Sequence, residues 1–421
     1  KCRTTIRDTR IMSSCAAHGA MSAFMRLADY TVILHGPRSC MFLMDMARGN
    51  PAIRLHQRGI YKHKPTHRLL CTMMDDTVSI FGGVKLLEDS LERAIREGSR
   101  RIAVITTCMP GIIGDDCERV ISNAREAHPD ADIRFVPTDG DMTGSFSEGM
   151  AMATVEIAKL MDTSVTKDPG CVNIIGQSFF DLHWEAGAKE LDRILGVLGL
   201  RVNCRFLDEC DSEEVRNFCR ASADILISCD RANRDIYKII SDRTGRMSLE
   251  APLPVGIREH AEWMRQMGEA FGKAEEAERE IASAEEEYRR FLEAHGGRFK
   301  GKRVIILGRK NDWLIELLMD LGADIVRIGV FPGMRQYYAD IPSRHQDMVT
   351  EDYTVDMLEG DLDALDPDLM ISELAFPVRG RCKAARMKKV GAGYKGAMMY
   401  AEYLENVMRA PTTEGWKEAV L

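Results

Sequence analysis

The clearest sign of the architecture is the segment TVILHGPRSC, residues 31–40, an apolar run of strand length that ends in a Gly-Pro turn and a cysteine. The same order recurs in RIAVITTCMPG, residues 101–111, where Cys108 follows the apolar run. Turns at the ends of parallel strands meet at one edge of an α/β sheet, so residues far apart in the sequence can come together there. These segments therefore predict a parallel sheet with cysteines along one edge.

Apolar runs of strand length alternate with amphipathic segments along the chain. This alternation is typical of parallel sheets that are covered by helices. The predicted strands are residues 30–34, 102–106, 133–136, 172–175, 202–206, 225–228, 304–307, 325–328 and 369–371. The predicted helices are residues 85–97, 113–127, 184–198, 262–292 and 313–321. We therefore expect an α/β fold with Rossmann-like domains, in which helices flank parallel sheets.

Two polar, glycine-containing segments, residues 162–170 and 296–302, each precede a new predicted strand and indicate domain boundaries. We expect three α/β domains, each large enough to bury a core of its own. They are residues 1–165, with the cysteines of the sheet edge, residues 166–298, which end in a long charged helix, and residues 299–421.

The composition excludes several classes of protein. Apolar residues make up 45% and charged residues 29% of the 421-residue chain, as in soluble globular proteins. The net charge of −8 argues against a primary role in nucleic-acid binding, which favours a basic surface. The sequence contains no apolar run long enough to span a membrane and does not begin with a signal-peptide pattern. We expect a cytoplasmic protein.

Twelve cysteines are spread singly along the chain, without a Cys-x-x-Cys pair, which argues against a zinc ribbon or a bacterial-type ferredoxin motif. Cys15, Cys40 and Cys108 are exceptional because each lies at a predicted turn. Thiolates gathered in a reducing compartment favour iron–sulfur clusters or zinc. We interpret four further cysteines as core thiols. They are Cys71, Cys171, Cys204 and Cys219.

The chain resembles the nitrogenase component 1 family. That family includes nitrogenase itself, dark-operative protochlorophyllide reductase, nickel-sirohydrochlorin reductive cyclase, methylthio-alkane reductase and cofactor-assembly scaffolds. The resemblance lies in HGPRSC at residues 35–40, IFGG at 80–83, and the segment from Thr106 to Asp116. In addition, VNIIG at residues 172–176 and GKRV at 301–304 are similar to the starts of the family's second and third domains.

The resemblance implies a metal site. In the family, three matching cysteines of each subunit bind a cluster at the interface of two homologous subunits, so Cys15, Cys40 and Cys108 would be metal ligands, of a [4Fe–4S] cluster or a P-cluster. Three thiolates leave such a cluster short of ligands, so a partner chain or another kind of ligand must complete it. A helix that begins near Ile112 could direct backbone N–H groups toward the cluster.

Each of the other polar residues near these cysteines can be interpreted in two ways. His18 and His35 could surround the cluster, but we interpret each as a packing histidine. Asp115 and Asp116 could bind metal, although two acids at a helix start also serve as cap and dipole partners, which we favour.

The resemblance also implies partners. No segment has the Walker A pattern that ATP hydrolysis needs, and Gly82-Gly83 is not a phosphate loop. In the family, a separate nitrogenase reductase-like iron–sulfur ATPase delivers the electrons. We therefore expect that ATPase and a homologous component 1 subunit, identical or different, as partners, and no nucleic acid or membrane.

Fewer sequence features indicate a second cofactor site. ILISCDR, residues 225–231, is similar to the segment that carries the cofactor cysteine of nitrogenase α-type subunits, so Cys229 could bind a second complex iron–sulfur cofactor. It could equally be a thiol that closes a buried strand. The family's cofactor histidine has no counterpart here; Cys382 lies close to its place and could replace it, or could pack in the core.

These features favour an oxidoreductase that acts on a substrate other than dinitrogen, because the cofactor histidine is missing and the chain is short. PLPVG, residues 252–256, is similar to β-type and scaffold subunits. The expected substrate is a small methylthio compound or a tetrapyrrole. The alternatives are a cofactor-assembly scaffold, and a plain binding protein for a small anion in which the cysteines are structural.

Overall fold

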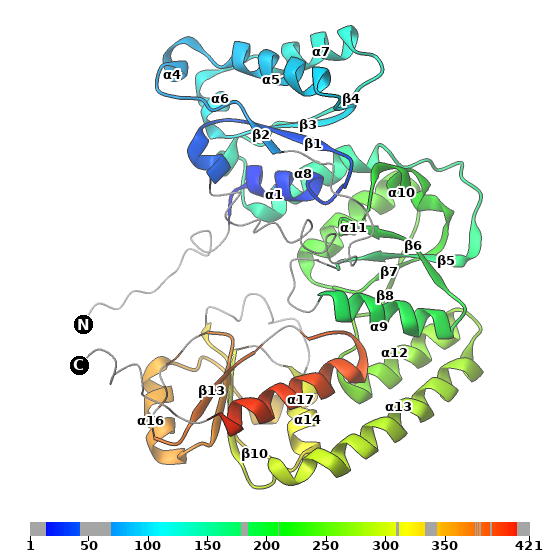
Figure 1. The fold of residues 1–421 in the computed structure, drawn as a ribbon, viewed down its shortest axis with the longest axis vertical. Helices are drawn as coiled ribbons and strands as arrows, with labels where there is room; N and C mark the ends of the chain where they lie inside the picture. The colour runs from blue at the N-terminus through cyan, green and yellow to red at the C-terminus, as the bar shows by residue number, and fades with distance from the viewer. Residues whose placement is uncertain are drawn as a thin grey trace. The chain divides into compact units, whose positions relative to one another are not determined.

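The computed structural model describes residues 14–42, 69–177, 184–208, 210–308, 311–332, 343–374, 376, 378, 380–387 and 390–410. In these residues the named strands form three sheets, and all of the strand pairs are parallel. Helices cover the sheets (Figure 1). The predicted fold class, α/β with Rossmann-like parallel sheets flanked by helices, is confirmed.

The first sheet has the strand order β2-β1-β3-β4. Its strands are β1 (Thr31–His35), β2 (Leu69–Cys71), β3 (Arg101–Thr106) and β4 (Asp132–Val136). On one face, Ile33 of β1 packs with α5 (Val84–Arg96) and α7 (Cys117–Ala127). On the other face, Val32 and Leu34 pack with α1 (Ala16–Phe24) and α8 (Phe146–Ala158). Successive residues of β1 thus serve opposite helical layers, which is why this central strand is apolar throughout (Figure 1).

Short elements connect these layers and lie at the edge where β1 and β3 end. They are α4 (Val78–Phe81), α6 (Cys108–Ile113) and the 3-10 helix η2 (Gly140–Met142).

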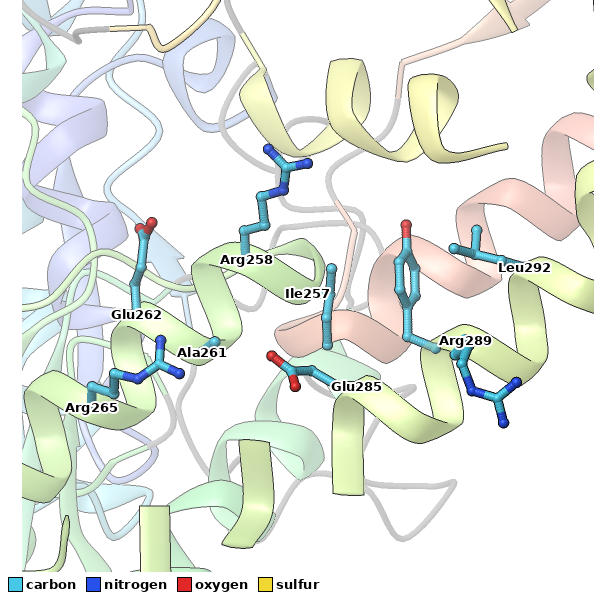
Figure 2. Close-up of a pocket in the computed structure, with 9 residues that line it drawn as sticks. Ile257, Arg258, Ala261, Glu262, Arg265, Glu285, Arg289 and Leu292 are labelled. Carbon is cyan, nitrogen blue, oxygen red and sulfur yellow. The ribbon is translucent and has the colours of Figure 1, made fainter. Parts of the chain in front are cut away.

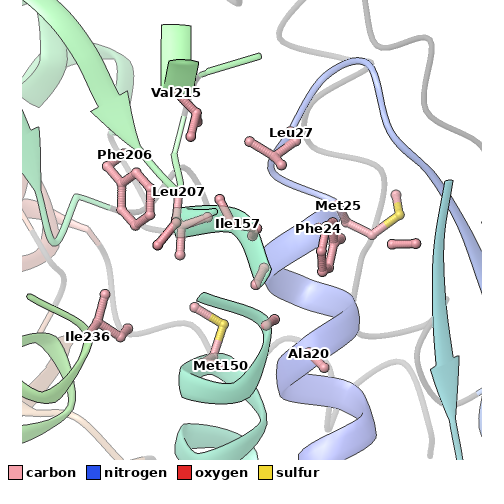
Figure 3. Close-up of a cluster of buried hydrophobic side chains, with 14 of the residues drawn as sticks. Ala20, Phe24, Met25, Leu27, Met150, Ile157, Phe206, Leu207, Val215 and Ile236 are labelled. Carbon is pink, nitrogen blue, oxygen red and sulfur yellow. The ribbon is translucent and has the colours of Figure 1, made fainter. Parts of the chain in front are cut away.

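The second sheet has the order β6-β5-β7-β8. Its strands are β5 (Asp168–Ile175), β6 (Arg201–Phe206), β7 (Ala221–Leu226) and β8 (Ser248–Glu250); the helices beside it are α10 (Ser212–Arg216), η3 (Asn217–Arg220) and α11 (Arg231–Thr244). Figure 3 shows that this sheet and the first share one apolar core: Phe24 of α1, Met150 of α8, Phe206 of β6 and Ile236 of α11 belong to the same cluster of buried side chains. That core fixes α1 against α8, and with it the residue that begins α1.

The third sheet has the order β11-β10-β9-β12-β13. Its strands are β9 (Arg303–Leu307), β10 (Asp324–Gly329), β11 (Val349–Thr350), β12 (Leu369–Ser372) and β13 (Lys383–Arg386). The helices and 3-10 turns grouped with it are α9 (Trp184–Val197), α12 (Gly256–Ala270), α13 (Ala274–His295), η4 (Gly296–Arg298), α14 (Asp312–Asp320), η5 (Gln346–Met348), α16 (Val355–Leu365) and α17 (Gly393–Arg409).

The chain divides into two compact units. The first comprises Lys1–Phe180 and Gly199–Pro252, with the first two sheets, and the second comprises Asp181–Leu198 and Leu253–Leu421, with the third. Each of the three predicted domain segments contains one sheet. The predicted boundaries themselves, at residues 165/166 and 298/299, stay a prediction.

Two predicted helices are wrong in their extent. The charged helix predicted for residues 262–292 is two helices, α12 and α13, because the chain turns at Gly272, whose φ of +65° suits glycine. The helix predicted for residues 113–127 is α6 and α7, separated at Gly114, whose φ is +75°. The expected helix start near Ile112 is therefore also wrong, since α6 begins at Cys108.

All nine predicted strands overlap observed strands, but β5 and β7 each begin four residues before the predicted start, and β7 also ends two residues early. Four short strands escaped prediction: β2, β8, β11 and β13. Each lies at the edge of its sheet.

Among the residues that the structure describes, no helix combines the length and the apolar character that a membrane crossing needs.

Candidate functional site

The turn after β1 is built around a close approach of two strand ends. His35 ends β1 and lies opposite Thr106, the last residue of β3. A Cβ atom on Gly36 would lie 2.2 Å from the Thr107 Oγ1 atom, so only glycine can pass between these strand ends. Pro37 follows, and its carbonyl accepts a hydrogen bond from the Cys40 N–H at 3.2 Å. The turn therefore places Cys40 just beyond the carboxyl end of β1.

Cys108 is the first residue of α6, and only Thr107, the N-cap, separates it from the end of β3. The Thr107 N–H donates to the His35 carbonyl at 3.0 Å, which ties this residue to the end of β1. The 3-10 helix η2 packs against Cys108 so closely that a Cβ atom on Gly140 would lie 2.7 Å from the Cys108 backbone nitrogen. Cys108 is thus held between β1 and η2.

Cys15 is the N-cap residue of α1. It forms an isolated β-bridge with Ser145, the residue before α8, and the next N–H, of Ala16, donates to the Gly144 carbonyl at 2.9 Å. The two helices start almost in contact, since a Cβ atom on Gly149 would lie 1.9 Å from the Ala16 carbonyl oxygen. The short segment from η2 to Ser145 therefore connects the surroundings of Cys108 with those of Cys15.

The three predicted cysteines are brought together, and a fourth joins them. Burial, and after it the neighbouring thiols of Cys108, Cys15 and Cys71, raise the pKa of the Cys40 thiol to about 11. All four are partly exposed and none is in a disulfide. We call Cys15, Cys40, Cys71 and Cys108 the thiol cluster. Its members come from four separate segments of the first compact unit.

The interpretation of Cys71 as a core thiol is therefore wrong, because its side chain is only partly buried and lies at the sheet edge. The other three cysteines of that prediction, Cys171, Cys204 and Cys219, are buried as expected.

The donor set of the thiol cluster can be tested against the kinds of metal that thiolates bind. In the part of the chain that the structure describes, no group of three or more His, Cys, Asp or Glu side chains converges tightly enough to hold a metal ion. A single tetrahedral zinc needs thiolate sulfurs only about 3.8 Å apart, as its Zn–S bonds of about 2.3 Å require. A cluster of several irons takes thiolates that are farther apart, and cysteines are its usual ligands. The four thiols fit that group better than zinc.

The side chains of His35 and Asp115 form a buried hydrogen-bonded pair at the end of β1. His35 is fully buried, and its Nε2 lies 3.1 Å from an Asp115 carboxylate oxygen while its Nδ1 lies 3.0 Å from the Thr72 hydroxyl. Because a carboxylate only accepts, Nε2 carries the proton and donates to Asp115. Asp115 also accepts from the Gly83 N–H at 2.8 Å. Burial lowers the pKa of His35, and Asp115 opposes that shift.

These contacts correct one expectation and confirm another. Asp116 is the N-cap of α7 and accepts from the Arg119 N–H, as expected for a cap. Asp115 is not a cap residue; it ties Gly83 to the end of β1. His18 stacks edge-on against Phe146 and bonds to Ser14, which supports its interpretation as a packing histidine.

Cys229 and Cys382 lie on other sheets. Cys229 follows β7, beside Asp230, the N-cap of α11, and its thiol donates to the Leu226 carbonyl at 3.3 Å. Burial raises its pKa to about 11. Cys382 is 4% exposed and packs with Leu307 and Tyr353 in the second compact unit, which favours a core thiol.

Among the residues that the structure describes, two cavities lie in the second compact unit, and Arg381 and Lys383, the sequence neighbours of Cys382, line one of them. One, of 410 Å³, lies between α12 and α13 (Figure 2). Arg258, Glu262 and Arg265 line it from α12, and Glu285 and Arg289 from α13. The charges alternate in sign, as on a solvated helical surface. The other, of 590 Å³, lies at the start of β13 and is lined mainly by Arg and Lys side chains that have acidic or carbonyl partners.

Comparisons with known proteins agree with this geometry. The family described as "Nitrogenase component 1 type Oxidoreductase" matches residues 15–408. The chain is 25% identical over 325 residues to the nitrogenase molybdenum-iron protein alpha chain of Methanosarcina barkeri; the match covers 75% of this chain and 59% of that one. It is 26% identical over 386 residues to the alpha chain of Methanothermobacter marburgensis, covering 88% of this chain and 80% of that one.

A relative with a different role is equally similar. The nitrogenase iron-molybdenum cofactor biosynthesis protein NifE of Clostridium pasteurianum is 24% identical over 353 residues, covering 82% of this chain and 74% of that one. Among solved structures, one described as "Nitrogenase Cp1 at pH 5" superposes with a TM-score of 0.68 at 20% identity, covering 96% of this chain and 90% of that one. That likeness concerns the fold.

Proposed function

The chain belongs to the family of nitrogenase component 1 type oxidoreductases, and on that premise we propose that it is a subunit of a nitrogenase-like two-component reductase. In this proposal Cys15, Cys40 and Cys108 bind an iron–sulfur cluster at a subunit interface, of the [4Fe–4S] or P-cluster kind. The observation that carries the proposal is the meeting of these three cysteines, from distant segments, at one edge of the first sheet. Bound there, the cluster would supply single-electron transfer.

The residues around the thiols have distinct tasks in this proposal. Each cysteine must give up its proton to bind iron, and the raised pKa of Cys40 means that the bound metal must compensate for that cost. Gly36 and Gly140 let backbone segments pack closely around the site. His35, held neutral between Asp115 and Thr72, fixes the start of the turn without adding charge beside the sulfurs.

The partners follow from the family. We propose that a nitrogenase reductase-like iron–sulfur ATPase delivers the electrons and that a homologous component 1 subunit, identical or different, packs against this one. We propose a substrate other than dinitrogen, either a small methylthio compound or a tetrapyrrole. The location would be the cytoplasm, where thiols stay reduced.

Cys229 remains our candidate for a second complex iron–sulfur cofactor. It lies partly exposed at the carboxyl end of β7, which is where ligands of open α/β sheets bind. The Cys229→Ala chain should then lose a metal component that the Cys382→Ala chain keeps, as measured by metal analysis of the anaerobic oligomer. Equal metal content in both would contradict a role for Cys229.

The central experiment is anaerobic purification with iron and sulfide analysis. We expect the unmodified chain to be coloured and to contain both elements. Cys40→Ala should remove most of the iron while leaving the protein folded, and Cys219→Ala, a buried thiol in η3, should leave the iron unchanged. Colourless, iron-free protein from the unmodified chain would overturn the proposal.

A second candidate function is a cofactor-assembly scaffold, which the similarity to NifE favours. A scaffold would hold its cluster transiently and pass it on. The two functions separate when the purified complex is supplied with its ATPase partner and reductant: a reductase consumes substrate, whereas a scaffold transfers metal cluster without turnover.

A further inference from the structure

Cys71 is placed at the thiol cluster by strand pairing. β2 is a three-residue edge strand that ends at Cys71, and its register with β1 puts Cys71 opposite Leu34. The next residues continue beside the turn, since the Thr72 N–H donates to the Leu34 carbonyl at 3.1 Å and the Met74 N–H to the Gly36 carbonyl at 3.0 Å. The segment that follows Cys71 therefore runs beside the turn that carries Cys40.

The Cys71 sulfur lies close to three backbone groups. Its thiol lies 3.4 Å from the Gly36 carbonyl oxygen and 3.8 Å from that of Pro37. The Met73 N–H points at the same sulfur, at 3.4 Å. A backbone N–H that points at a sulfur favours its thiolate form and is one of the ways in which proteins tune iron–sulfur clusters.

The backbone after Cys71 has an uncommon conformation. Met73 has a φ of +56°, in the left-handed region that residues other than glycine rarely adopt. Its side chain is half exposed, so packing of that side chain does not explain the conformation. What the conformation achieves is the N–H contact to the Cys71 sulfur, two residues back. Strained residues of this kind cluster at functional sites.

We propose that Cys71 is a fourth metal ligand, so that this chain alone supplies the four thiolates that a [4Fe–4S] cluster takes. The inference rests on the proposed function and changes one part of it, because no ligand from a partner chain is then needed. On binding, the Cys71 thiol releases one proton to solvent and forms one sulfur–iron bond, with no change in oxidation state. Its contacts with the two carbonyls give way to that bond, while the Met73 N–H stays.

The test compares iron content and electron paramagnetic resonance spectra of four anaerobically reconstituted chains: unmodified, Cys40→Ala, Cys71→Ala and Cys219→Ala. We expect Cys71→Ala to lose about one iron in four and to show the spectrum of a three-iron cluster, or to lose the cluster. Cys219→Ala should match the unmodified chain. If Cys40→Ala lost its iron while Cys71→Ala matched Cys219→Ala in both measurements, Cys71 would not be a ligand, although the proposed function would stand. Iron retained by Cys40→Ala would overturn the proposed function itself.

A second measurement uses only the unmodified chain, so it does not depend on the folding of a variant. The unmodified chain is alkylated with iodoacetamide before and after iron removal, and each cysteine is followed by mass spectrometry. A ligand should be protected at least about ten-fold by bound iron, since a metal-bound thiolate is not free to react. We expect this protection for Cys71 and Cys40 alike. Equal labelling of Cys71 in the loaded and stripped protein would overturn the inference.

Discussion

The carboxyl ends of the first and second sheets have the same topology but different chemistry. Each is a sheet of four parallel strands, and the strands follow one another along the chain in the same spatial order in both. The first gathers four thiols, whereas the groups that act on Cys229 at the second are charged: Glu250, Arg234 and Asp230. The fold thus supplies the position, and the side chains at the strand ends supply the chemistry.

Acidity alone does not separate the two edges. The thiols of Cys40 and Cys229 both have a pKa raised to about 11, in both cases first by burial. The further causes differ: other thiols act on Cys40, while Glu250 raises and Arg234 lowers the pKa of Cys229. The groups around each thiol, and not its pKa, therefore distinguish the two edges.

The comparison fails most directly if the thiols of the first edge do not hold iron. Replacing Cys40 with alanine should lower the iron of the first site at least about ten-fold, because a ligand is removed. Cys171→Ala, a buried thiol in β5 of the second sheet, should leave it unchanged. Anaerobic iron analysis checks both. Similar iron in the two variants would show that the thiol cluster is not the binding site.

The close packing of the first edge can be tested through Gly36. A Cβ atom there meets the Thr107 side chain at 2.2 Å, so Gly36→Ala should lower the free energy of unfolding by about 1–3 kcal/mol. In the control, Gly196→Ala in α9, the added Cβ meets nothing within 4 Å, and stability should be unchanged or higher by up to about 1 kcal/mol. Urea denaturation of the metal-free chains measures both values. A Gly36→Ala chain as stable as the control would show that the strand ends have room to move apart.

Acidic pH should lower the free energy of unfolding through His35, at the end of β1. Burial lowers the pKa of His35 in the folded chain, so below the ordinary value of 6.5 the unfolded chain binds a proton that the folded chain does not. The free energy of unfolding should therefore fall as the pH drops from about 7 to 5, by about 1.4 kcal/mol for each unit of pKa depression. The half-buried His18, whose pKa burial also lowers, contributes in the same direction.

Urea denaturation at several pH values measures that slope, and His35→Gln serves as the control. The glutamine variant should have a smaller slope because one of the two groups is gone. An unchanged slope would mean that His35 does not take part.

The smallest expected effect concerns the thiols themselves. The Cys108→Ser substitution should lower the pKa of the neighbouring Cys40, because a like-charged group is lost. It should leave the pKa of Cys229 unchanged. The pH dependence of alkylation in the metal-free chain measures both. Equal shifts at the two cysteines would indicate a change in the fold rather than a local interaction.

Prediction from sequence worked best where burial is complete. Central strands such as β1, β3 and β9 are covered on both faces and read as continuous apolar runs. The edge strands β2 and β13 are short and partly exposed, so they carry no such run. The break between α12 and α13 was missed because the charge pattern continues across Gly272, and only the backbone reverses there.

The sequence by itself determined the α/β class, the strand-end positions of Cys40 and Cys108, and the choice of Cys15 as their companion. These follow from local patterns and short motifs. Tertiary structure alone decided that Cys71 joins them and that Asp115 binds His35. The physical reason is that both depend on partners more than thirty residues away, which meet only when β2 pairs with β1 and α6 packs beside it.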